Sequence, residues 1–278
     1  MQVASEQAAI SVIDDVERFE ILRASYHRHV FPPHMHDTYA IGVHEAGRSR
    51  VLYRGSIQTI RPNGVIVIEP GTVHTGVPDD EVGWRYRMLY VPVQIVAEAS
   101  GTDEPLPRFL SCFYENAGLA SRLLAVHRQL ELSGNAENAR ADMRSAISDL
   151  IRMHAVPADE TAAGKLPAAV IRAQEYLHAH FSETVTLDTL AKVSGLSAFQ
   201  LIRVFRRFLG LPPYMYLEQI RIDRARDLLR SGVPTARVAY ETGFCDQSHL
   251  TRRFKRVVGV PPTQYARSHW KSNVRPID

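Results

Sequence analysis

Short runs of β-branched and aromatic residues, separated by turn signals, make up residues 31–93. Three of these runs have the composition of β-strands: Thr38–His44, Val65–Ile68 and Trp84–Tyr90. The last run alternates large side chains with long polar ones, and a glycine turn ends the segment Glu45–Gly47. Closely spaced strands without an intervening helix predict a small all-β barrel or sandwich.

After Pro107 the apolar residues recur at helical spacing. One stripe consists of Leu119, Leu123, Leu124, Val126 and Leu130, and a second of Met143, Ile147, Leu150 and Ile151. The turn residues Ser133–Asn135 separate the stripes, so the pattern predicts a helical hairpin over residues 101–155. Its apolar stripes could cover the β domain, or they could pair two copies of the chain. Residues 156–166 contain few bulky apolar residues and are the predicted linker.

An internal repeat occupies the C-terminal part of the chain. The segment Ala191–Leu196 recurs as Ala239–Phe244, 48 residues later. The pattern of residues 201–216 then recurs in residues 250–265, at an offset of 49. In each copy a glycine follows a short helical segment at the position where a left-handed turn would end it. Two tandem helix-turn-helix units are therefore predicted.

The second helix of each copy combines an apolar face with an opposite polar face. Ser197 and Asp246 are placed to cap these helices. The apolar faces carry Leu201, Phe205, Phe208 and Leu209 in the first copy, and Leu250, Phe254 and Val257 in the second. The opposite faces carry Phe199, Gln200, Arg203, Arg206 and Arg207, and then Gln247, Ser248, Thr251, Arg252 and Lys255. Basic and amide groups opposite a core face are typical of recognition helices that bind DNA.

The residues between the copies, Tyr214–Arg230, form a continuous amphipathic pattern. A helix of this length spans roughly 25 Å. With its flanking turns it could hold two recognition helices about one DNA turn, or ~34 Å, apart. We therefore expect both helices to enter successive major grooves on one face of double-stranded DNA.

Charge is divided unevenly along the 278 residues, although the net charge is only +3. From Lys165 onward the net charge is +9, whereas the preceding residues sum to −6. A basic module joined to an acidic one is typical of a nucleic-acid-binding domain attached to a domain with another role. No stretch approaches the ~18 apolar residues of a membrane helix, and no signal peptide is recognisable. With only Cys112 and Cys245, the composition predicts a cytoplasmic protein.

The repeat resembles the AraC/XylS family of bacterial transcription regulators. The matching segments are Thr186–Ser197, Val238–Lys255 and Gly259–Pro262. The resemblance implies seven helices in two helix-turn-helix units joined by a rigid linker helix. It places the base-reading positions on Phe199, Ile202 and Arg203, and on Gln247, Ser248, Thr251 and Arg252. Arg206, His249 and Lys255 complete the expected DNA contacts, with His249 placed to meet phosphate rather than a base.

Histidines concentrate in the N-terminal part, where His34, His36 and His74 are the candidate site residues. His-x-His on a strand puts both imidazoles on one face, and a third histidine could complete a metal site. The pattern resembles a cupin barrel, but the carboxylate expected after His36 falls on Ala40 or Ile41, and Glu69 replaces a proline. The resemblance to AraC-type regulators implies an organic effector without metal or other cofactor.

By the same resemblance, Trp84, Tyr86 and Met88 share one face of a strand and line the effector cavity with the three histidines. A purely structural role for these histidines remains open. The first twenty residues could form an arm whose position changes when the effector binds. The expected domains are a cupin-like effector-binding barrel with its arm (1–100), the hairpin that pairs subunits (101–155), the linker (156–166) and the DNA-binding domain (167–278).

The predicted function is that of an effector-responsive transcription regulator, an activator that acts as a homodimer and contacts RNA polymerase. It is not an enzyme in this interpretation. Two alternatives stay open: a metal-dependent cupin enzyme fused to a DNA-binding domain, and a DNA-binding protein that responds to no effector.

Overall fold

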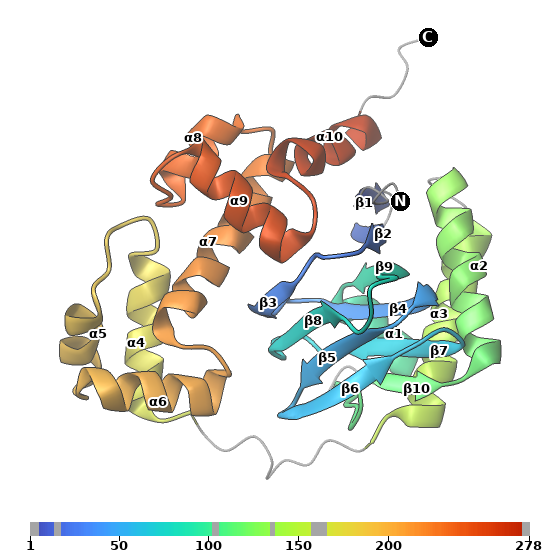
Figure 1. Ribbon diagram of the computed structural model, residues 1–278, viewed down its shortest axis with the longest axis horizontal. Coiled ribbons are helices and arrows are strands. Elements are labelled where there is room, and N and C mark those ends of the chain that lie inside the picture. Colours follow the sequence, from blue (N-terminus) through green and yellow to red (C-terminus); the bar gives the residue numbers. More distant parts are fainter. Residues whose placement is uncertain (1–5, 14–17, 102–105, 134–136, 157–165, 274–278) are drawn as a thin grey trace. The chain divides into compact units, whose positions relative to one another are not determined.

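The computed structural model describes residues 6–13, 18–101, 106–133, 137–156 and 166–273, with side chains as far as Ser268 except that of Ser133 (Figure 1). The chain forms two compact units, which divide between Ala158 and Asp159. This division falls inside the predicted linker, most of which lies outside the described residues. Strands and three helices make up the first unit, and the second unit is helical.

The first unit contains two antiparallel sheets, as the all-β prediction requires. The six-stranded sheet has the order β1 (Gln7–Ile13), β2 (Phe19–Tyr26), β9 (Trp84–Val91), β4 (Tyr39–Gly47), β7 (Gly64–Ile68) and β10 (Phe113–Glu115). The four-stranded sheet has the order β3 (Phe31–His34), β8 (His74–Pro78), β5 (Ser49–Tyr53) and β6 (Ser56–Ile60). The three strands predicted from the sequence are β4, β7 and β9.

The segment expected to be an N-terminal arm belongs to the larger sheet where it is described. Residues 7–13 form β1 and pair with β2 along their whole length, from Gln7 opposite Ser25 to Ile13 opposite Phe19. Ile13 and Phe19 are buried in the core. Apolar side chains and backbone hydrogen bonds thus hold residues 7–13 as an edge strand, and a movement of this segment on effector binding stays a prediction.

Three helices cover one face of the six-stranded sheet: α1 (Val93–Ser100), α2 (Ala117–Ser133) and α3 (Glu137–His154). Figure 1 shows α2 and α3 side by side next to the strands. Their buried stripes, represented by Leu123 and Ile147, join Ile41 and Leu89 of the sheet in one hydrophobic core. The structure thus assigns the stripes to covering the β domain. The turn predicted at Ser133–Asn135 lies largely outside the described residues.

The second unit contains seven helices within the described residues, as the family resemblance implies. They are α4 (Ala168–Ala179), α5 (Leu187–Ser194), α6 (Ala198–Leu209), α7 (Pro213–Arg230), α8 (Thr235–Glu241), α9 (Gln247–Val258) and α10 (Pro262–Asn273). The pairs α5–α6 and α8–α9 are the two helix-turn-helix units, and α7 is the predicted continuous helix between them.

The turns and caps of the two units follow the repeat. Gly195 ends α5 with a φ of +72°, and Gly243 adopts a φ of +73° after α8. The Ser197 side chain accepts a hydrogen bond from the Gln200 backbone N–H, and Asp246 accepts one from that of His249. Each carboxylate or hydroxyl satisfies a backbone donor that the first turn of a helix leaves unpaired.

The predicted apolar faces of α6 and α9 are buried at their centres, whereas Leu209 and Val257 near their C-terminal ends are half-buried. Leu201, Phe205, Leu250 and Phe254 are fully buried. Phe208 is 38% exposed, and the guanidinium of Arg207 lies 5.6 Å from its ring centre. The assignment of Phe208 to the core is therefore wrong. Helical periodicity gives the direction of a side chain but not the point at which the neighbouring helices cease to cover it.

Candidate functional site

The recognition helices α6 and α9 present the predicted DNA-binding side chains on their uncovered faces. Exposed residues are Phe199, Arg203, Arg206, Gln247, Ser248, Arg252 and Lys255, whereas Ile202, His249 and Thr251 are half-buried. Within the described residues, none of the four cations in this set forms an ion pair. Their charges remain available to phosphates or to the acceptor edge of guanine.

Local contacts restrict what the two half-buried residues of α9 can offer. The Thr251 hydroxyl donates a 2.8 Å hydrogen bond to the Gln247 carbonyl, which leaves its methyl group as the outer contact surface. The His249 ring packs perpendicular to that of Phe244, with ring centres 5.3 Å apart. Thr251 is therefore suited to an apolar contact such as a thymine methyl group, and His249 is partly engaged in packing.

The turn of the second unit is held against the segment after α4. A Cβ atom on Gly243 would lie 2.6 Å from the Ser182 carbonyl oxygen, so the backbones approach closely there. Arg221 of α7 donates hydrogen bonds to the carbonyls of Phe181 (2.7 Å) and Glu183 (2.8 Å), on either side of Ser182. The position of α9 on α7 thus depends on backbone contacts that side-chain patterns do not reveal.

A second candidate site lies inside the β domain, where a cavity opens between the two sheets. All six predicted effector-binding residues line it: His34, His36, His74, Trp84, Tyr86 and Met88. Strand alternation explains the last three, because Trp84, Tyr86 and Met88 face the cavity while Arg85 and Arg87 face the other side of the sheet. The structure therefore brings together residues that lie up to 54 positions apart in the chain.

The three imidazoles form a cluster at the cavity wall. Ring centres lie 4.2 Å apart for His34 and His74, 5.0 Å for His36 and His74, and 6.5 Å for His34 and His36. Burial, followed by the proximity of His34 and His36, lowers the pKa of His74 well below its ordinary value. His74 is therefore neutral at pH 7.

The geometry departs from that of a cupin metal site at two of the expected positions. Among the described residues, no group of three His, Cys, Asp or Glu side chains has an arrangement that could hold a metal ion. Ala40 lines the cavity at the position of the missing carboxylate. The Glu69 carboxylate accepts hydrogen bonds from Arg54 (2.6 Å) and from the Phe109 backbone N–H (2.6 Å) and does not line the cavity.

Four further polar residues of the cavity were missed: His44, Ser49, Thr75 and Tyr90. The Ser49 hydroxyl and His44 Nε2 are 3.3 Å apart, and burial lowers the pKa of His44 to about 4. His44 lies on the same face of β4 as Ala40 and opposite Tyr86 of β9. The alternation of side chains along a strand could have identified His44 as a cavity residue, because the strand predicted from the sequence already included it.

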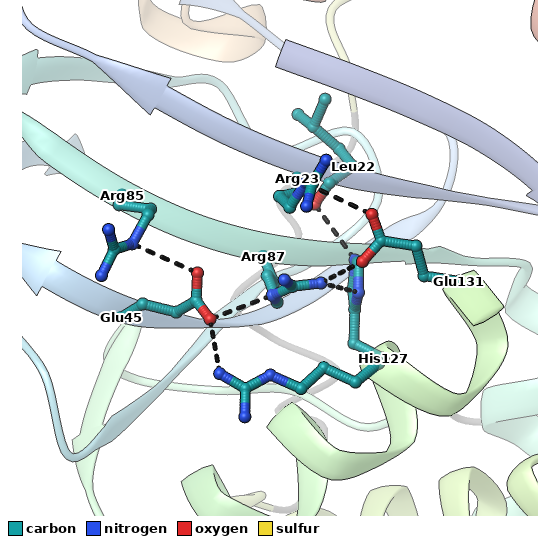
Figure 2. A network of polar contacts seen from close by, with 8 residues as sticks. Leu22, Arg23, Glu45, Arg85, Arg87, His127 and Glu131 are labelled. Atoms are coloured by element: carbon teal, nitrogen blue, oxygen red, sulfur yellow. Dashed lines mark hydrogen bonds and ion pairs between the residues drawn. The ribbon is translucent and has the colours of Figure 1, made fainter. Parts of the chain in front are cut away.

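Behind the cavity strand, a polar network joins β9 to β4 and α2 (Figure 2). The buried Arg87 guanidinium contacts Glu45 of β4 at 3.1 Å, and Glu131 and His127 of α2 at 2.5 and 3.1 Å. Because an arginine can only donate, Nδ1 of His127 accepts, and its Nε2 donates to the Leu22 carbonyl at 3.2 Å. The network fixes α2 on the face of β9 opposite the cavity.

Comparisons with known proteins match both parts of the chain. Residues 18–151 match the AraC-like ligand binding domain, and residues 190–268 match a helix-turn-helix domain. The chain is 32% identical to YbfI of Bacillus subtilis (strain 168), an uncharacterized HTH-type transcriptional regulator, across 79% of this chain and 81% of YbfI. It is 26% identical to the HTH-type transcriptional activator RhaS of Escherichia coli (strain SE11), across 84% of this chain and 86% of RhaS.

The fold has a counterpart among solved structures. An apo ToxT variant from Vibrio cholerae strain SCE256 superposes with a TM-score of 0.55 at 12% identity, covering 96% of this chain and 98% of ToxT. A β domain with a ligand cavity, followed by two helix-turn-helix units, defines a transcription regulator with a ligand-binding domain and a DNA-binding domain. The chain belongs to the AraC family of these regulators. None of its described helices is long and apolar enough to cross a membrane.

Proposed function

We propose that the protein is an effector-controlled transcription activator that acts as a homodimer and contacts RNA polymerase at its promoters. The main observation in support of this proposal is the cavity of the β domain. It is lined by all six predicted effector residues, His34, His36, His74, Trp84, Tyr86 and Met88. The similarity to RhaS, a named activator, supports activation rather than repression. In this proposal the β domain is a cupin-like barrel that binds a ligand without transforming it.

The DNA interface in this proposal consists of the outer faces of α6 and α9. The first helix contributes Phe199, Ile202, Arg203 and Arg206, and the second contributes Gln247, Ser248, His249, Thr251, Arg252 and Lys255. Bidentate contacts from arginine to guanine and from glutamine to adenine would give sequence discrimination. Ile202 has no donor, so α6 is expected to read fewer bases than α9.

The homodimer is proposed to form through the hairpin surface that the β domain leaves uncovered. The buried stripes are occupied by the sheet, but Ser121, Ala125 and Leu132 recur on the exposed side of α2. Replacing Ala125 by Glu would place a charge in the centre of that surface. Sedimentation should then show a monomer for Ala125→Glu and a dimer for the unmodified protein; a dimer in both would remove this surface from the proposal.

The experiment that tests the function combines footprinting with transcription in vitro. Upstream regions of genes next to the coding sequence are incubated with the full chain and then with purified RNA polymerase. We expect two protected half-sites in successive major grooves, and transcription that rises only when an effector is present. Protection of a single groove, with α6 dispensable, would contradict the paired-helix interface, and effector-independent transcription would favour the constitutive alternative.

A further inference from the structure

The three cavity histidines share one hydrogen-bonding pattern. Each ring places Nδ1 against the carbonyl of a residue two positions away: His34 against Pro32 at 2.8 Å, His36 against Thr38 at 2.6 Å, and His74 against Thr72 at 3.0 Å. A carbonyl oxygen can only accept, so Nδ1 carries the proton in each ring. In a neutral imidazole Nε2 is then an acceptor, and a backbone carbonyl selects this tautomer in each of the three rings.

The charge of the cavity wall also bears on the kind of ligand that it can bind. Among the described residues that line the cavity there is no lysine, arginine, aspartate or glutamate. Burial of a ligand carboxylate there would be unfavourable, because no cation replaces its lost hydration. Its oxygens would also meet imidazole nitrogens that accept hydrogen bonds rather than donate them. The wall therefore disfavours an anionic ligand.

The cavity also offers donors and an apolar surface. The indole N–H of Trp84 is buried and has no hydrogen-bond acceptor within the described residues. Burial raises the pKa of the Tyr86 phenol, so this group keeps its proton. Ile60, Ile66 and Ile68 supply apolar wall against which a carbon skeleton can pack. A ligand that satisfies this wall must donate to the imidazoles and accept from the indole, and a hydroxyl group does both.

We propose that the effector is a neutral, hydroxyl-bearing molecule whose hydroxyl groups donate to Nε2 of His74, in the cluster of three imidazoles, and accept from the indole of Trp84. The inference rests on the proposed effector function of this cavity and adds the chemical class of the ligand. It assigns the histidines to the recognition of uncharged donors rather than to a metal or to a carboxylate.

The first test reads the protonation of the imidazoles and requires no ligand. The full chain is labelled with ¹⁵N-histidine, and long-range ¹H–¹⁵N spectra at pH 7 identify the protonated nitrogen of each ring, assigned by single substitutions. We expect Nδ1–H in His34, His36 and His74. His127 is a reference with the opposite tautomer, since its Nδ1 accepts from Arg87. Protonation at Nε2 in the cavity histidines, or at both nitrogens, would overturn the proposal, as would stoichiometric uptake of Zn²⁺ by their Nε2 atoms.

The second test compares neutral probes with their own carboxylates. Each pair consists of a hydroxylated compound and the corresponding acid: glucose with glucuronate, xylitol with xylonate, and benzyl alcohol with benzoate. We expect at least one neutral member to raise the melting temperature of the full chain by several degrees in a saturable manner, whereas its acid does not. His74→Phe should abolish the shift, and His180→Asn, a substitution in the helical unit, should preserve it.

Stabilisation by the acid member of a pair, or by no neutral member, would overturn the assigned ligand class. The melting experiment contains no DNA, so its result is independent of the regulatory function. A neutral probe that stabilises the chain through His74 but leaves DNA binding and transcription unchanged would support the ligand chemistry and contradict the effector function instead.

Discussion

Tyr86 and Arg87 are consecutive on β9 and lie on opposite sides of the larger sheet. The Tyr86 ring lines the cavity, and the Arg87 guanidinium contacts Glu131 and His127 of α2 (Figure 2). One strand therefore carries both the ligand-facing wall and the main polar attachment of the helical layer. A displacement of β9 by a bound ligand would act directly on the position of α2, without a chain of intermediate side chains.

This attachment leads to a stability prediction for a matched pair of arginines. Arg87 and Arg85 both contact Glu45, but their side chains are 8% and 55% exposed. Arg87→Ala leaves Glu45 and Glu131 without their buried partner and should cost about 3–5 kcal/mol. Arg85→Ala should cost less than about 1 kcal/mol, because water screens that pair. Urea unfolding of both variants measures the difference; equal losses would show that the network contributes no more than a surface ion pair.

Acid sensitivity of the β domain follows from its buried histidines. Burial lowers the pKa of His44 to about 4, and burial together with the Arg87 charge lowers that of His127 to about 4. Between this value and the unfolded pKa near 6.5, the unfolded chain binds more protons than the folded one. The free energy of unfolding should therefore decrease as the pH falls from about 6.5 to 4, by up to about 1.4 kcal/mol per pH unit for each histidine.

Substitution of one buried histidine separates its contribution to the pH dependence of stability from that of the carboxylates. Unfolding free energies are measured at intervals from pH 4 to pH 7 for the unmodified chain and for His127→Asn. The slope should be smaller in His127→Asn, which lacks the buried ring. A slope that is the same in both proteins would mean that His127 gains a proton as readily when folded as when unfolded.

The sequence was sufficient for features that periodicity and repetition encode. The offset between the Gly195 and Gly243 segments predicted both helix-turn-helix units, and alternation along β9 placed Trp84, Tyr86 and Met88 on one face. Contacts between segments that are distant in the chain could not be predicted from the sequence. The pairing of β1 with β2, and the selection of Arg87 rather than Arg85 for burial, depend on which surfaces meet in three dimensions.

Long-range packing also distinguishes the two glycine turns. Gly195 and Gly243 have nearly equal φ angles of +72° and +73°, so alanine should cost about 1–2 kcal/mol at either position. At Gly195 the nearest group to an added Cβ is the Arg172 guanidinium at 3.7 Å, whereas at Gly243 it is the Ser182 carbonyl oxygen at 2.6 Å. Gly243→Ala should therefore be the more destabilising substitution in thermal unfolding. Equal losses would show that the segment after α4 yields to the methyl group without cost.

The proposed base-reading role of Arg252 can be tested against its neighbour on α9. Arg252 is exposed on the outer face, whereas Arg253 lies 3.4 Å from Glu218 of α7 and faces the unit itself. Arg252→Ala should lower the affinity for the operator by about 1–3 kcal/mol and relax discrimination at one base position. Arg253→Ala should leave the base preference unchanged. Selection of bound sequences from a random pool measures both effects. If Arg252→Ala weakened binding to every sequence equally, the guanidinium would contact phosphate, and its loss would reduce the salt dependence of binding without changing the preferred site.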